Sequence, residues 1–213
     1  MLSYVPTVIN CLEKTLREYS DEEVQPIKRW FARELSLSVV YALRSPELLD
    51  TRRVIEEVLS FLRNPPENAY VVYSEYQPFW FGYTTAMTVH YDDMNTCFFH
   101  DIAKYMSDRS LASIFLHELV HLSDTSSEVE AFTVQEYCAE KNPEHLATDS
   151  EVREEVREIA RKHSLYPSLY QFRLINLFAF AEKAKKKRYL SKVMRHAKKI
   201  KEWRKAVEWR KAW

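Results

Sequence analysis

The sequence predicts an α+β protein that is mostly helical, with a small antiparallel or mixed sheet and extra N- and C-terminal helices. Apolar residues recur at helical spacing along most of the 213 residues. β-branched and aromatic residues concentrate in a single segment, residues 70–100. The chain holds one glycine, Gly82, whereas an all-β sandwich or barrel would need many tight turns.

The first 66 residues are expected to form an N-terminal helical segment. Ser45 and Pro46 are typical of a helix start, with serine as the cap and proline at the first helical position. The Asn-Pro-Pro run at 64–66 should end that helix, because the residue before a proline avoids helical geometry. A second amphipathic helix is expected upstream, from the spacing of Trp30, Leu35, Val39, Val40 and Leu43.

Residues 70–100 should supply the sheet, as two or three strands with a hairpin turn at 92–95. Helical patterning resumes at Ser107 and continues, with breaks, to the end of the chain. The chain therefore divides into three parts that we expect to form one compact unit. These are an N-terminal helical segment (1–66), a central core (67–141) and a C-terminal helical region (142–213).

The composition excludes several classes of protein. Hydrophobic residues make up 46% of the chain and aromatic residues 14%, unlike a disordered or fibrous sequence. A single glycine argues against a phosphate-binding loop or a dinucleotide-binding fingerprint, because both need several glycines close together. No run of 18 apolar residues is present to span a membrane, and the first twenty residues lack the features of a signal peptide.

The cysteines indicate a reducing compartment. Cys11, Cys97 and Cys138 are far apart in the sequence and form no CxxC pair. An odd number of cysteines at such spacing is typical of reduced, structural thiols. We therefore expect a cytoplasmic protein.

Residues 117–121, His-Glu-Leu-Val-His, carry the strongest chemical signal in the chain. The residues before them are helical in composition, and residues four apart lie on one face of a helix. His117 and His121 can therefore bind one metal ion together, and zinc suits imidazole ligands. Glu118 lies beside them, where a carboxylate can take a proton from a metal-bound water. The alternative interpretation is a pair of solvated surface histidines next to an ordinary glutamate.

The motif resembles that of the zincin metallopeptidases, and the likeness covers roughly residues 70–140. It implies that the central core (67–141) is a zincin-like catalytic core, with the small sheet packed on the HExxH helix. In such a core the edge strand of the sheet lines the substrate cleft. Residues 87–100 are placed to supply that strand, and a peptide could add to it in extended form.

The resemblance also suggests a third zinc ligand. The metzincin pattern fails, because Asp124 and Ser127 stand where that subfamily has its glycine and its third ligand. Gluzincins supply a glutamate from a following helix, often within an ExxA pattern, which residues 128–131 match. Glu128 is thus the candidate ligand and Glu130 the alternative. The helical neighbours of Glu128 favour it, because they would form the inward-facing side: Ala131, Phe132 and Cys138.

Two features depart from the gluzincin pattern. The link between His121 and Glu128 is short, and Phe132 replaces the Asn or Asp that often follows the ExxA alanine. The most similar group is the minigluzincins, which include small intracellular peptidases that cleave repressors in bacteria and phages. Glu128 also has a second interpretation as a capping carboxylate, because it follows Thr125-Ser-Ser at an expected helix N-terminus.

The resemblance implies a zinc-dependent peptidase that binds one Zn²⁺ per chain and acts on a peptide or protein substrate. Zinc would polarise the scissile carbonyl, while Glu118 deprotonates the bound water and passes the proton to the leaving amine. A further donor should stabilise the oxyanion. Five side chains are candidates for that donor: His100, His145, His163, Tyr166 and Tyr170. A non-proteolytic hydrolase that uses the same zinc-bound water is a further alternative.

Residues 182–213 form a strongly basic tail, with 14 Lys and Arg against three acidic residues, although the whole chain has no net charge. Apolar residues recur there at helical spacing, which predicts a basic amphipathic helix. That helix could pack on the acidic remainder of the chain, contact nucleic acid without sequence specificity, or bind an anionic membrane surface or a partner. The alternative function is therefore a nucleic-acid- or membrane-surface-binding protein with a structural or vestigial metal site.

Overall fold

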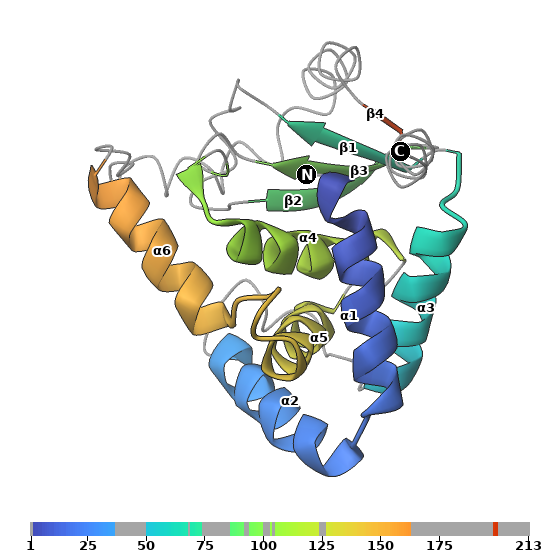
Figure 1. Ribbon diagram of the computed structural model, residues 1–213, viewed down its shortest axis with the longest axis vertical. Coiled ribbons are helices and arrows are strands. Elements are labelled where there is room, and N and C mark those ends of the chain that lie inside the picture. The colour runs from blue at the N-terminus through green and yellow to red at the C-terminus, as the bar shows by residue number, and fades with distance from the viewer. Residues whose placement is uncertain are drawn as a thin grey trace.

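The computed structural model describes residues 2–36, 50–67, 69–73, 86–91, 94–99, 103, 105–123, 127–162 and 198–199. These residues form six α-helices (Figure 1): α1 (Val5–Arg17), α2 (Asp21–Ser36), α3 (Thr51–Arg63), α4 (Asp108–Leu122), α5 (Glu128–Lys141) and α6 (Asp149–Lys162). A short 3-10 helix, η1 (Leu2–Tyr4), precedes α1. The strands are β1 (Ala69–Tyr73), β2 (Ala86–Tyr91), β3 (Met94–Phe99) and β4 (Lys198–Lys199).

The α+β fold class predicted from the sequence is wrong: the predicted majority of helix is present, but in the described part of the chain the helices alone form the framework. Its body consists of helices that bury their apolar faces against one another: α5 packs on α4 and α2, and α1 packs on α3. The strands are two to six residues long and lie at one side of this body (Figure 1). A sheet is therefore not the framework of the fold. The composition suggested a larger role for the sheet because β-branched and aromatic residues are enriched at buried positions as well as in strands.

The short strands pair in the order β2-β3-β1-β4. β2 and β3 form an antiparallel hairpin, β1 runs parallel to β3, and β4 is antiparallel to β1. Met94 and Asn95 belong to β3, so the predicted hairpin turn at 92–95 is wrong at these two residues, and residues 92–93 lie outside the described part of the chain. β2 lies at one end of this order, directly above α4 in Figure 1.

Side-chain caps define where three of the helices begin. Asp50 caps α3, its carboxylate accepting from the backbone N–H groups of Arg52 and Arg53. The predicted start of this helix at Ser45 and Pro46 lies outside the described residues. Serines cap the other two helices, Ser107 before α4 and Ser127 before α5, each accepting from an N–H three residues on.

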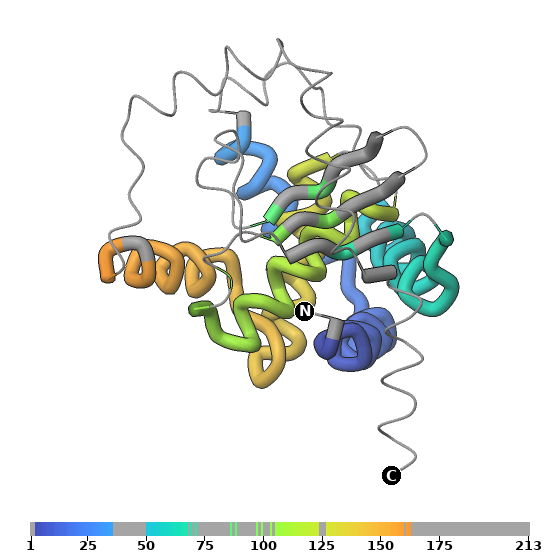
Figure 2. The backbone as a smooth tube through the Cα atoms, turned by 90° about the horizontal axis from the view of Figure 1, so that it is seen from above, coloured from blue at the N-terminus to red at the C-terminus, as the bar shows by residue number. Residues whose placement is uncertain are grey.

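Helix α5 is the centre of the helical body. Viewed from above, the strands cross over α4 and α5, with α3 on one side and α6 on the other (Figure 2). Tyr137, Val134 and Cys138 of α5 are fully buried and belong to a single hydrophobic core shared with α1, α3 and α4. Because α5 has neighbours on most sides, its rotation about its own axis determines which side chains meet which partner.

A buried ion pair ties α5 to α2. The Lys28 ammonium contacts the Glu130 carboxylate, and both side chains are almost completely buried. Thr51 Oγ1, at the start of α3, donates to Glu130 Oε2 at 3.0 Å and accepts from Lys28 Nζ at 3.3 Å. These three residues join three helices around the first turn of α5.

Two other expectations concern the C-terminal part of the chain and the membrane. Lys198 and Lys199 form strand β4 on β1, so the predicted helix over 182–213 is wrong at these two residues. β4 pairs with the side of β1 that β3 does not occupy, and lysine is common on edge strands. The other residues of that segment lie outside the described part. In the described ranges, no helix has the length and apolar character that a membrane crossing requires.

The buried pair leads to the first prediction. Glu130→Gln should lower the free energy of unfolding by about 3–5 kcal/mol, because it leaves the Lys28 charge buried without its carboxylate. Urea denaturation measures this change. Glu57→Gln is the matched control: it removes an exposed pair with Arg53 and should cost less than about 1 kcal/mol. Equal effects of the two substitutions would contradict a stabilising role of the buried pair.

Candidate metal centre

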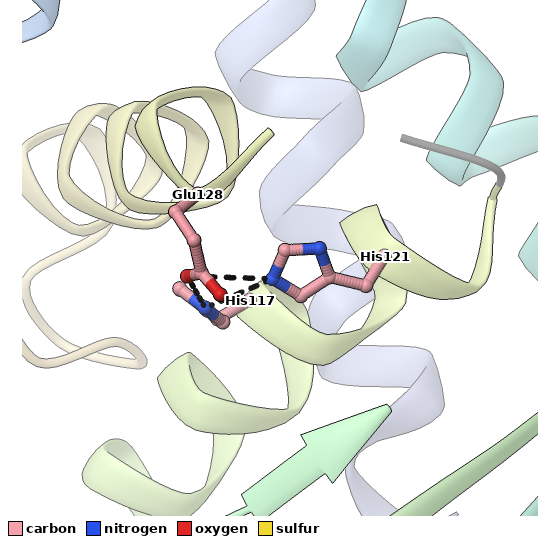
Figure 3. Close-up of side chains that lie close together, drawn as sticks. All are labelled: His117, His121 and Glu128. Atoms are coloured by element: carbon pink, nitrogen blue, oxygen red, sulfur yellow. Dashed lines mark hydrogen bonds and ion pairs between the residues drawn. The ribbon is translucent and has the colours of Figure 1, made fainter. Parts of the chain in front are cut away.

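Helix α4 carries both histidines of the HExxH motif into the interior. Twelve of its 15 residues are buried, including His117 and Glu118, while His121 near its C-terminal end is half-buried. One helical turn separates the two histidines, so both imidazoles project from the same face. Their Nε2 atoms lie 3.3 Å apart (Figure 3).

The first turn of α5 brings Glu128 to these histidines (Figure 3). Glu128 Oε2 is 3.3 Å from His117 Nε2 and 3.6 Å from His121 Nε2. Ser127, the residue before it, is the N-cap of α5, so the capping role considered for Glu128 belongs to its neighbour. The short link between α4 and α5 therefore suffices to place a carboxylate on the histidine pair.

The spacing of the three donor atoms fits a zinc ion. Zinc binds imidazole nitrogen and carboxylate oxygen at about 2.0–2.2 Å in tetrahedral geometry, which separates neighbouring ligand atoms by about 3.3–3.5 Å. The three observed separations are 3.3, 3.3 and 3.6 Å. The side chains of His117, His121 and Glu128 are 11%, 13% and 30% exposed, so the centre borders solvent, as a site that also binds a water must.

The alternative third ligand, Glu130, lies elsewhere. Its carboxylate is fully buried against Lys28 and Thr51. The sequence favoured Glu128 over Glu130 because the helical neighbours of Glu128 were expected to face inward. In the structure both sides of the helix are covered, and Glu130 is the more buried of the two residues. Burial alone therefore did not distinguish the two carboxylates; their partners do.

Glu118 lies next to the three donors in a different environment. Burial raises the pKa of its carboxyl, an effect that the nearby His117 and His121 partly offset. The Thr88 hydroxyl of β2 donates to Glu118 Oε2 at 2.7 Å and lies 3.1 Å from the Glu118 carbonyl oxygen. For Glu128 burial also favours the neutral acid, but hydrogen bonds from both histidines outweigh it and hold its pKa well below the usual range. Glu128 is thus kept as an anion, the form that binds metal.

Phe132 fills the space beside His117. The two rings are 4.4 Å apart, and Phe132 stacks on Phe31 of α2 at 5.1 Å. His117 Nδ1 is buried and has no hydrogen-bond partner among the described residues. Phe132 thus gives His117 an apolar contact.

The structure describes the position of one of the five candidate oxyanion donors, His145. Its side chain is exposed, its Nε2 lies 3.9 Å from Glu144 Oε1, and it lines a cavity with Asp108 and Arg109. Those two residues belong to the first turn of α4, about two turns before His117, so His145 is not brought to the donor cluster. The other four candidates lie outside the described residues: His100, His163, Tyr166 and Tyr170.

Sequence reasoning missed Thr88 and the contact between His117 and Phe132. Thr88 occurs in a segment of alternating strand character and has no motif around it. Only the position of β2 above α4 reveals that its hydroxyl reaches Glu118. Neither contact has a signal in the sequence, because each joins elements that are not adjacent in the chain.

The geometry predicts the metal-binding behaviour of the wild type and of three variants. The wild-type chain should bind one zinc, and His117→Ala should abolish that binding because it removes one of three protein ligands. Glu128→Ala should lower the affinity for zinc by more than about 100-fold, which exceeds the effect of losing a residue that only hydrogen-bonds to a ligand. Glu118→Gln should bind zinc like the wild type. Elemental analysis and calorimetric titration measure stoichiometry and affinity.

His145→Ala is the control for these variants, since it removes an exposed histidine outside the donor cluster. Its zinc stoichiometry should stay at one per chain. Zinc retained in full by His117→Ala, or lost in His145→Ala, would contradict the assigned ligand set.

Comparisons with known proteins identify no relative of this chain. No family model matches it, nor does any curated protein or solved structure. The interpretation of the centre therefore depends on its own chemistry: two imidazoles and an anionic carboxylate that converge at zinc-ligand spacing, with a buried glutamate beside them.

Proposed function

We propose that the protein is a zinc-dependent peptidase. The observation that carries this proposal is the convergence of His117, His121 and Glu128 beside the buried Glu118. A purely structural zinc site is usually closed by four protein ligands. Among the described residues this cluster has three donors, next to a carboxylate that is not one of them, which is the arrangement of a hydrolytic centre.

The residues divide into two roles. His117, His121 and Glu128 would hold the metal. A zinc ion bound there would lower the pKa of its water toward about 7 and polarise a substrate carbonyl. Glu118 would accept the proton of that water and later deliver it to the nitrogen of the leaving amine. The buried position of Glu118 suits this role, because burial raises its pKa toward that of a group that can exchange a proton near neutrality.

The arrangement of β2 supports a peptide substrate over other hydrolysable compounds. In the strand order β2 has β3 on one side and no described strand on the other. β3 lies between β2 and β1, so only residues 87–91 of the 87–100 segment predicted to line the cleft belong to a strand at the edge of the described sheet. An extended peptide could pair with the free side of β2, close to Glu118.

We also propose a cytoplasmic location for the protein. Cys11, Cys97 and Cys138 are unpaired and buried, which suits a reducing compartment such as the cytoplasm. Contact with nucleic acid or an anionic surface through residues 182–213 stays a prediction, because the described part of that segment is limited to Lys198 and Lys199.

The test of the proposed function is the hydrolysis of labelled casein by the zinc-loaded chain. Glu118→Gln should reduce the rate by about 10²–10⁴-fold, the usual contribution of a general base, while one zinc per chain is retained. His145→Ala should cleave like the wild type. Hydrolysis that survives Glu118→Gln would refute the role of Glu118. A zinc-loaded wild type that cleaves neither casein nor a mixed peptide library would refute the peptidase assignment.

A further inference from the structure

We infer that Thr88 is a positioning residue that holds the Glu118 carboxylate in place for proton transfer. This inference rests on the proposed peptidase function, in which Glu118 is the general base. The hydroxyl of Thr88 bonds to Glu118, not to the candidate metal ligands, so Thr88 would act through Glu118.

The geometry places the Thr88 hydroxyl against one defined oxygen of the carboxylate. Thr88 Oγ1 lies 2.7 Å from Glu118 Oε2, a short distance typical of a hydroxyl that donates to an ionised acceptor. The same hydroxyl lies 3.1 Å from the backbone carbonyl oxygen of Glu118. One side chain of β2 therefore contacts both the backbone and the carboxylate of a single residue on α4.

This contact has two consequences for the proposed reaction. Occupation of Oε2 by Thr88 leaves Oε1 of Glu118 as the oxygen that receives the proton from water. Because Thr88 belongs to the strand proposed to bind the substrate, it also ties the general base to the strand against which a peptide would lie. Orientation of this kind affects the chemical step more than substrate binding.

Two substitutions test the inference in the zinc-loaded full chain, with labelled casein as substrate. Thr88→Val keeps the shape and the β-branch but removes the hydroxyl, and Thr88→Ser restores the hydroxyl. Thr88→Val should lower kcat by about 10–100-fold with KM changed less than about threefold and one zinc retained. Thr88→Ser should return kcat to within about threefold of the wild type. An unchanged kcat in Thr88→Val, or loss of zinc from it, would overturn the inference, as would a Ser variant as slow as the Val variant.

A double-mutant cycle on zinc-free protein tests the contact without any activity measurement. Thr88→Val should raise the unfolding equilibrium constant by about tenfold in the wild type and by less than about threefold in Glu118→Ala, where the acceptor is missing. Equal effects in the two backgrounds would refute the contact. Coupling in a chain that binds zinc but hydrolyses nothing would instead refute the peptidase function, and with it the catalytic part of this inference.

Discussion

The rotation of α5 about its axis is the constraint on which the centre depends. Two carboxylates in its first turn, Glu128 and Glu130, are two residues apart and therefore point about 200° away from each other. Glu130 meets Lys28 on α2, and Glu128 meets the histidines of α4 on the opposite side. A rotation of α5 by one residue would break both contacts at once. The buried ion pair and the metal-ligand cluster therefore stabilise the same orientation of the helix.

Glu128 and Glu118 differ in the direction of their pKa shifts because their surroundings differ. Glu128 contacts two imidazoles, whose hydrogen bonds outweigh the effect of burial, lower its pKa and favour its anion. Glu118 is buried more deeply, and this burial outweighs the effect of His117, His121 and Thr88, which favour the anion. Its pKa is therefore raised and its neutral form gains stability. The first is suited to ligate a cation and the second to exchange a proton, although the two side chains are chemically identical.

Local patterns predicted the local features well. The spacing of His117 and His121, the resumption of helix at Ser107 and the end of α3 before Pro65 all depend on residues that are close in sequence. Features that depend on distant residues could not be read in this way: the partner of Glu130 is Lys28, and that of Glu118 is Thr88. The fold class failed for a related reason. Whether a segment becomes part of a sheet depends on its tertiary packing, and β-branched residues also pack well in the core between helices.

The sequence distances within the centre have one more consequence. The three candidate ligands lie within a stretch of 12 residues, yet Lys28, whose ion pair holds the helix of the third one, lies about a hundred residues upstream, in α2. A fragment that begins at residue 67 would contain these three candidates and lack Lys28 together with α1, α2 and α3. We therefore expect that such a fragment would not keep the geometry of the candidate centre. Its ligands are local in the chain, whereas their geometry is a property of the complete helical assembly.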